Sequence, residues 1–259
     1  MLESIITGEN VFLFLAVFLA FFVKAITGFG NTLVMGSLFS FVVPNTITTP
    51  VDLLMSIPTN GYIAWRERSA ILLKKAIPLS LLMMIGLIPG TFFLTMGEDW
   101  LLRALLGLVI VGMALQIARG RRGRGRGRGR EGAHPEKCKT LVLILTGLFS
   151  GILAGLFGIG ALVAIYFSKR AESKQELRSS TCFVFFLENI FRVILYFATG
   201  ILNRQIFLIT LALTPAVILG MAVGRNVDKY INDEKMKGGV IVLLIISGAT
   251  LFIRNVFFR

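Results

Sequence analysis

The stretch Thr27-Gly28-Phe29-Gly30-Asn31-Thr32 decides how this chain folds, because it interrupts an apolar segment that would otherwise be continuous. Backbone groups left unpaired by such a break are costly next to lipid. An irregular stretch at membrane depth must therefore face protein or a water-filled cavity. The pattern predicts a helix that stops at the glycines and restarts at Asn31, with the break turned towards the interior of a membrane protein.

The composition places the whole chain in the membrane. Of the 259 residues, 55% are hydrophobic and 16% are charged, against about 45–50% and about 25% in ordinary globular domains. The mean hydropathy is +0.80. A soluble fold of this size could not cover so much apolar surface, so we expect an all-α, polytopic bundle of membrane helices in the cell inner membrane.

The supply of reactive side chains argues against catalysis. The chain has one histidine, His134, and two cysteines, Cys138 and Cys182, which form no metal or redox spacing. A membrane enzyme would need a cluster of His, Asp or Glu near the interface, and the acids here are scattered. We therefore expect no enzymatic activity, no metal and no cofactor, and we expect Cys182 to be a buried, inert thiol.

Several apolar runs are too short to cross a bilayer straight, which takes about 20 residues. The two shortest follow a glycine-rich break. Broken or re-entrant helices explain short runs better than ten full spans do. The runs cover residues 10–26, 31–43, 51–65, 76–96, 101–118, 140–157, 159–168, 179–200, 205–224 and 238–253.

The second half of the chain repeats features of the first. The break at Gly28 is echoed by Gly155-Leu156-Phe157-Gly158-Ile159-Gly160, and Asn60 matches Asn189 at an offset of 129. Leu33-Val34 matches Leu162-Val163 at the same offset, and Gly86 and Gly90 match Gly220 and Gly224 at 134. An ordered series of matches indicates duplication. We predict two membrane repeats, residues 1–118 and 140–259, joined by a linker over residues 119–139.

The basic residues orient the chain, because basic loops stay in the cytoplasm. The linker holds nine basic residues and two glutamates, and so supplies +7 of the net charge of +13. An N-terminus with acids and no base before the first run predicts an outside start without a secretory signal. If each half crosses the membrane an odd number of times, the two halves have opposite orientations and are inverted repeats. The predicted cytoplasmic turns carry Arg66 to Lys75, Arg119 to Lys139, Lys169 to Arg178, and Arg225 to Lys237, and the predicted outside turn carries Glu98 and Asp99.

The linker is rich in Arg-Gly pairs, which are also common in RNA-binding segments. It lacks the interleaved aromatic residues that stack on bases, so we expect no nucleic-acid partner. Its place between membrane segments favours a topology anchor that attracts anionic lipid headgroups.

Two facing helix breaks suggest an anion site. A helix that restarts after a break offers free N–H groups and the positive end of its dipole. In transporters built from inverted repeats, such ends meet near the midplane and bind substrate. The alternative is that the glycines only allow close packing of helices, which either motif alone would favour.

Polar residues within the apolar runs add donors to this hypothesis. Asn60 and Asn189 either bind the substrate or join two helices. Glu188 and Arg192, spaced i,i+4, predict an internal ion pair from which Arg192 can still offer a donor. Lys24 either extends to the interface or raises the local potential. The candidate site residues are Thr27, Gly28, Phe29, Gly30, Asn31, Thr32, Asn60, Phe157, Gly158, Ile159, Gly160, Asn189 and Arg192.

The Gly-Phe-Gly break, its echo Gly-Leu-Phe-Gly-Ile-Gly and the charged loop between two similar halves resemble the TauE/SafE sulfite exporter family. The resemblance covers nearly the whole chain except the Arg-Gly tract. It implies a bacterial or archaeal inner-membrane permease for sulfite, sulfonates or related small anions. Family members often run several glycines together after the phenylalanine, whereas here Asn31 and Thr32 follow Gly30, and Ala161 follows Gly160.

The expected function is export of a small sulfur oxyanion by alternating access, with the substrate held between the two breaks. An anion that leaves a negative cytoplasm gains about 2.3 kcal/mol per charge per 100 mV, so a uniporter would suffice. No cation site is evident, since Asp52 and Glu188 are the only acids away from the edges of the apolar runs. An anion channel, or a scaffold whose glycines serve packing only, is the alternative. The oligomeric state is left open.

Overall fold

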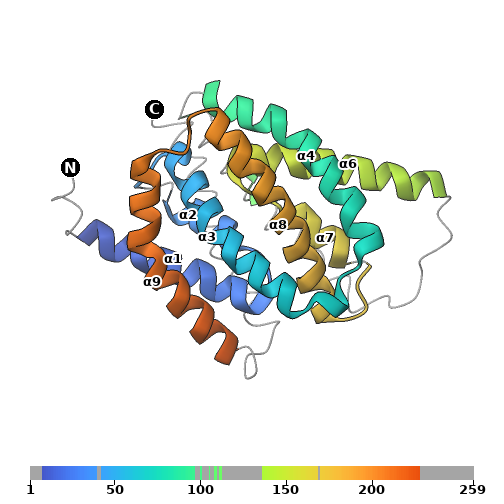
Figure 1. The fold of residues 1–259 in the computed structure, drawn as a ribbon, viewed down its shortest axis with the longest axis horizontal. Helices are drawn as coiled ribbons and strands as arrows, with labels where there is room; N and C mark the ends of the chain where they lie inside the picture. The colour runs from blue at the N-terminus through green and yellow to red at the C-terminus, as the bar shows by residue number, and fades with distance from the viewer. Residues whose placement is uncertain are drawn as a thin grey trace.

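The computed structural model describes residues 8–39, 42–96, 100, 105, 108–109, 111–112, 136–168 and 170–227. Within these ranges every regular element is helical, which confirms the predicted all-α class (Figure 1). The elements are α1 (Gly8–Thr27), α2 (Asn31–Phe39), α3 (Asn45–Arg66), the short 3-10 helix η2 (Arg68–Ala70), α4 (Leu73–Met96), α6 (Glu136–Phe157), α7 (Ala161–Ser168), α8 (Lys174–Ala198) and α9 (Arg204–Val227).

Four helices in the described part of the chain are long and apolar enough to cross a membrane: Leu73–Leu94, Thr140–Phe157, Lys174–Ala198 and Arg204–Val227. Their outer faces carry large apolar side chains, such as Phe197, which is 78% exposed. Side chains of this kind on the surface of a bundle are suited to lipid. The fold is that of a polytopic membrane helix bundle, as predicted.

The helices begin and end close to the predicted apolar runs. Both predicted breaks are present, between α1 and α2 and between α6 and α7. The predicted runs 101–118 and 238–253 lie wholly or mostly outside the described residues, and so do the turn at 98–99 and nearly all of the Arg-Gly linker.

The order of elements recurs along the chain. A long helix, a break, a helix of eight or nine residues and two long helices occur as α1 to α4 and again as α6 to α9. The contacts cross between the two sets, because α1 packs on α9, α4 packs on α6, and α3 packs on α8 (Figure 1). The inverted relation between the two sets stays a prediction.

Glycines bring α4 and α6 into close contact. A Cβ atom added at Gly151 would overlap the backbone oxygen of Met83 and come within 2.8 Å of the Gly86 Cα. One at Gly155 would come within 2.7 Å of the Thr91 backbone nitrogen. Small residues that let backbones approach are the usual device for joining helices in lipid. On α9, Gly220 and Gly224 serve the same purpose against α1.

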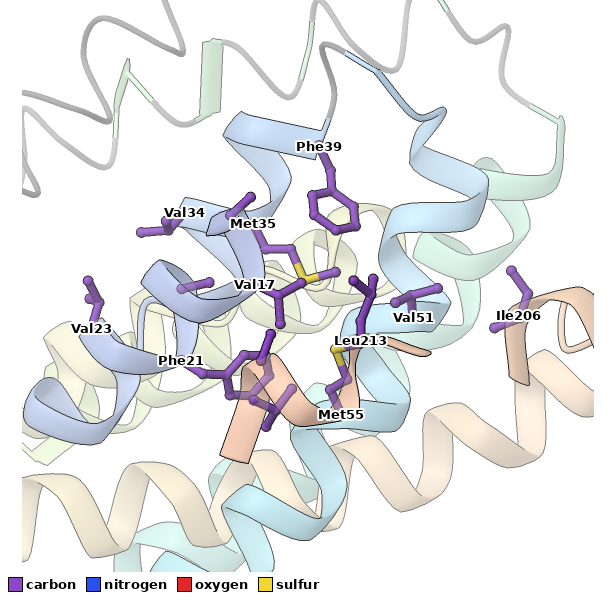
Figure 2. Close-up of a cluster of buried hydrophobic side chains, with 14 residues drawn as sticks. Val17, Phe21, Val23, Val34, Met35, Phe39, Val51, Met55, Ile206 and Leu213 are labelled. Carbon is purple, nitrogen blue, oxygen red and sulfur yellow. The ribbon is translucent and has the colours of Figure 1, made fainter. Parts of the chain in front are cut away.

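The largest buried apolar cluster lies where α1, α2, α3 and α9 meet (Figure 2). Val17 and Phe21 of α1, Met35 of α2, Met55 of α3 and Leu213 of α9 all belong to this cluster. This packing holds the short helix α2, which has few hydrogen bonds of its own, against the long helices. It thereby sets the position of the first break.

The described parts of three of the basic turns predicted to be cytoplasmic, at residues 66–75, 170–178 and 225–227, lie at one end of the bundle. Arg178 at the start of α8 forms an ion pair with Glu67 at the end of α3, and its Nε donates to Glu67 Oε2 at 3.1 Å. Arg225 at the end of α9 donates to the Tyr62 hydroxyl of α3 at 3.0 Å. Shared location supports a shared membrane side, although the side itself stays a prediction.

The glycine contacts predict a specific loss of stability. We expect Gly151→Ala to lower the melting temperature in detergent, because overpacking at an interface costs about 1–3 kcal/mol. The matched control is Gly36→Ala in α2, where an added Cβ meets no described atom within 4 Å. Gly36→Ala should melt at or slightly above the wild-type temperature. Equal melting of both variants would contradict close α4–α6 packing.

Candidate functional site

The first break is shaped by glycine backbone conformation and by Thr27. Gly28 and Gly30 have φ angles of +80° and +97°, which side-chain-bearing residues rarely adopt. The Gly28 N–H still donates to the Lys24 oxygen at 2.7 Å, and the Thr27 hydroxyl donates to the Val23 oxygen at 2.9 Å. These bonds satisfy the end of α1, and the chain then restarts as α2 at Asn31.

The second break uses the same device. Gly158 has a φ of +71°, and its N–H donates to the Ala154 oxygen at 2.8 Å. The Ile159 N–H donates to the Leu153 oxygen at 3.3 Å. Gly160 has a different role, because an added Cβ would overlap the Phe185 ring. The second break is therefore pressed directly against α8.

A small polar cavity lies between the two breaks. The space open to a water-sized molecule is about 20 Å³, enough for about one or two water molecules. Helices α3 and α8 close its sides. Its lining consists of Phe29, Gly30, Asn31, Thr32, Leu33, Asp52, Ser56, Asn60, Gly158, Ile159, Gly160, Phe185, Glu188, Asn189 and Arg192.

Most of the candidate site residues meet at this cavity, including Arg192 and the three asparagines Asn31, Asn60 and Asn189. Three do not line it. Thr27 ends α1, Gly28 lies under the side chain of Arg178, and Phe157 is 3% exposed in an apolar cluster with Leu33 and Ile159. These three residues contribute to the shape of the breaks without lining the cavity.

Arg192 is the central cation of the cavity. It is 1% exposed, and its Nε lies 3.2 Å from Glu188 Oε1, so the predicted i,i+4 ion pair is confirmed. Its Nη1 donates to the Ala154 oxygen at 2.5 Å, and its Nη2 donates to Asn189 Oδ1 at 3.0 Å. A guanidinium has five N–H groups, so these three partners do not exhaust its donors. Arg192 also ties α8 to the end of α6.

The same contacts orient Asn189. Because Asn189 Oδ1 accepts from Arg192, the amide presents its Nδ2 as the remaining donor end. One turn further along, the Tyr196 hydroxyl donates to the Gly155 oxygen at 3.2 Å. Tyr196 is fully buried, and the Arg192 guanidinium lies over its ring. Arg192 and Tyr196 of α8 are thus both bonded to backbone oxygens near the end of α6.

The face of α3 contributes Asp52 and Ser56, which the sequence analysis did not include in the site, together with Asn60, which it did. Asp52, Ser56 and Asn60 recur every four residues and all line the cavity. The Asp52 carboxylate accepts from Asn31 Nδ2 at 2.7 Å and from the Thr32 hydroxyl at 2.6 Å. Asn31 Nδ2 also donates to Ser56 at 2.9 Å. These bonds fix the restart of α2 to α3.

Asn60 differs from these residues in its bonding. It is 2% exposed, and among the described residues its Oδ1 has no hydrogen-bond partner. A buried amide with an unused polar atom is costly unless something else pairs with it. Oδ1 is an acceptor and is suited to a donor such as water, so only the Nδ2 end of this amide could donate to an oxyanion.

Lys24 does not extend to the interface, so that alternative of the sequence analysis was wrong. Its side chain is 1% exposed, with Nζ 5.3 Å from the centre of the Phe21 ring. Among the described residues Nζ has no hydrogen-bond partner. It does not line the cavity, but it is close enough to Asp52 for the two groups to interact electrostatically. Cys182, also buried, donates to the Gly28 oxygen at 3.1 Å.

A helical period of polar residues would have identified the missed groups. On α8, Phe185, Glu188, Asn189 and Arg192 share one face, and on α3 the same is true of Asp52, Ser56 and Asn60. Polar residues in such a stripe within an apolar helix mark a face turned away from lipid. Which stripes face one another was not readable, because it depends on the packing of α3 on α8.

The arrangement is suited to holding an oxyanion. Guanidinium, amide and hydroxyl donors converge with the first turns of α2 and α7, whose initial N–H groups have no partner within their own helix. In the described part of the chain, no three His, Cys, Asp or Glu side chains gather in a way that could hold a metal.

A family model described as "Sulfite exporter TauE/SafE" matches residues 13–251. No curated protein and no solved structure matches this chain.

The buried ion pair predicts how stability responds to its removal. Arg192→Gln leaves Glu188 buried without its partner, and we expect a loss of about 3–5 kcal/mol in the free energy of unfolding. The double variant Glu188→Gln/Arg192→Gln should recover most of that loss, because no buried charge is then unpaired. Melting temperatures of both single variants and the double variant test the pair. Additive losses in the double variant would contradict it.

Proposed function

We propose that this chain, which belongs to the TauE/SafE sulfite exporter family, exports sulfite, sulfonates or related small anions across the inner membrane. Membership of the family makes it a membrane exporter of the sulfite type. The observation that carries the proposal is the convergence of both helix breaks on one cavity with a buried arginine.

The donors of the cavity match an anion with several oxygens. Arg192 has N–H groups beyond those that its protein partners use, and the Asn189 amide presents Nδ2. Asn60 also lines the cavity, and its amide carries a donor group, Nδ2. Sulfite and sulfonates carry three oxygens around one sulfur, so donors from several directions are needed. Hydrogen bonds to a charged group are worth about 1.5–3 kcal/mol, enough to select an oxyanion.

The small size of the cavity supports alternating access. A volume of about 20 Å³ is too small for a sulfonate, so we propose that the cavity widens to one side to admit it. The ion pair between Glu67 and Arg178 joins α3 to α8 at the basic end, and the Arg178 side chain covers Gly28. We propose that this pair opens when substrate enters from the cytoplasm.

Rocking between two inverted repeats would give that opening. We propose that residues 1–118 and 140–259 form the repeats and that the linker 119–139 anchors the cytoplasmic side through anionic lipid. The exchange of contacts between the two helix sets supports this, because each set then contributes one break and one polar helix face to the cavity.

Transport into liposomes tests the function. Purified protein should catalyse flux of labelled sulfite and sulfonates in preference to chloride. Asn60→Ala should weaken substrate affinity several-fold, because it removes a neutral hydrogen bond worth about 1 kcal/mol. Its melting temperature should stay near wild type, since Asn60 Oδ1 has no protein partner among the described residues.

The matched control is Thr59→Val, the neighbouring position on α3. Thr59 is buried, and its hydroxyl donates only to the Met55 and Ser56 oxygens of its own helix. This variant should transport with wild-type affinity. Rapid flux of chloride and sulfite alike would indicate a channel. Absence of flux in correctly inserted protein would favour the scaffold alternative.

Substitution of the break glycines is a poorer test. Gly30 and Gly158 have positive φ angles, so any side chain there strains the backbone whether or not it blocks the site. Loss of binding and loss of stability would then occur together. Amide variants separate the two effects.

A further inference from the structure

Asp52 is the one carboxylate of the cavity without a cationic bonding partner. It is 1% exposed, and the hydrogen bonds that it accepts come from neutral groups, the Asn31 amide and the Thr32 and Ser56 hydroxyls. Glu188, the other carboxylate in the lining, lies 3.2 Å from the Arg192 guanidinium. A buried carboxylate on the wall of an anion site opposes the anion by charge.

The charges around Asp52 balance before any substrate enters. No residue of α2 is ionisable, and the charged side chains of α9 lie at its two ends. Asp52 and Glu188 offset Lys24 and Arg192, so an entering monoanion leaves one negative charge uncompensated in a region largely closed to water. The titratable groups that act electrostatically on Asp52 in the described part of the chain are Lys24 of α1 and Glu188, Arg192 and Tyr196 of α8.

We propose that Asp52 is a proton-binding site coupled to the anion, so that one proton from solvent bonds to its carboxylate as the anion binds. This inference rests on the proposed function and names its coupling ion. Protonation of Asp52 breaks no ion pair, whereas protonation of Glu188 would leave Arg192 unpaired. The proton cancels the charge that the anion brings.

The hydrogen bonds give this coupling a local mechanism. The ionised carboxylate holds two donors at the restart of α2, Asn31 Nδ2 at 2.7 Å and the Thr32 hydroxyl at 2.6 Å. A protonated carboxyl accepts less strongly and itself becomes a donor. Asn31 and Thr32 then turn towards the anion. Binding of the proton therefore favours binding of the anion, and binding of the anion favours binding of the proton. This is positive coupling between two sites.

Calorimetry measures the proton directly. Methanesulfonate is the probe, because it does not titrate near neutral pH and any proton taken up therefore belongs to the protein. Binding enthalpies are measured at one pH in buffers of different ionisation enthalpy. For wild-type protein in detergent we expect uptake of about one proton per anion above the pH at which free Asp52 ionises, and an affinity that falls by about tenfold per pH unit there.

Asp52→Asn keeps the shape and should bind methanesulfonate without proton uptake and without this pH dependence. The controls are Glu188→Gln and Lys24→Gln. We expect each variant to bind methanesulfonate with a changed affinity and still to take up a proton on binding. Thr32→Val provides a second test should Asp52→Asn fail to fold. It removes a donor that stabilises the ionised carboxylate, so the onset of proton uptake should move to higher pH.

The possible outcomes distinguish failure of the Asp52 proton site from failure of the proposed anion transport. Binding by wild-type protein without proton uptake overturns the Asp52 site and leaves anion transport intact. Uptake that persists in Asp52→Asn, or is lost only in Lys24→Gln or Glu188→Gln, assigns the proton elsewhere and overturns the site. If wild-type protein binds neither methanesulfonate nor sulfite, the proposed function fails, and the proton site fails with it.

Discussion

The structure depends on one constraint: a helix that breaks at membrane depth must have its free backbone groups met by something other than lipid. Two such breaks, at Gly28 to Gly30 and at Gly158 to Gly160, are turned towards each other and away from the surface. Short helices that continue from them are too small to be stable alone, so they are held by packing on α3 and α8. The cavity is what remains between the breaks once that packing is complete.

Helices α3 and α8 differ from the helices around them because they carry polar stripes. On α8, the stripe is organised by Arg192, which is bonded to Glu188, Asn189 and the end of α6. On α3, it is organised by Asp52, which holds the restart of α2. One stripe is thus built around a paired cation and the other around a carboxylate with neutral donors. That difference suits the first to hold an anion and the second to exchange a proton.

Outside this polar centre the bundle is held by apolar and small residues. Glycines on α4, α6 and α9 bring backbones into contact, where dispersion and close packing replace the hydrophobic effect that lipid does not supply. Large apolar side chains on the outer faces are suited to lipid. The scaffold therefore requires apolar and small residues, whereas the cavity requires polar ones. The two kinds of residue lie on different helix faces.

The sequence by itself determined the membrane class, the helix order and both breaks, because hydropathy and glycine act locally along the chain. It also identified the Glu188–Arg192 pair, since i,i+4 spacing lies within one helix. Only the tertiary structure decided that Asp52 meets the restart of α2, that Lys24 is buried instead of extending to the interface, and that Phe157 packs behind the break. Those outcomes depend on which faces of separate helices meet, and that is settled by side-chain packing between segments far apart in the chain.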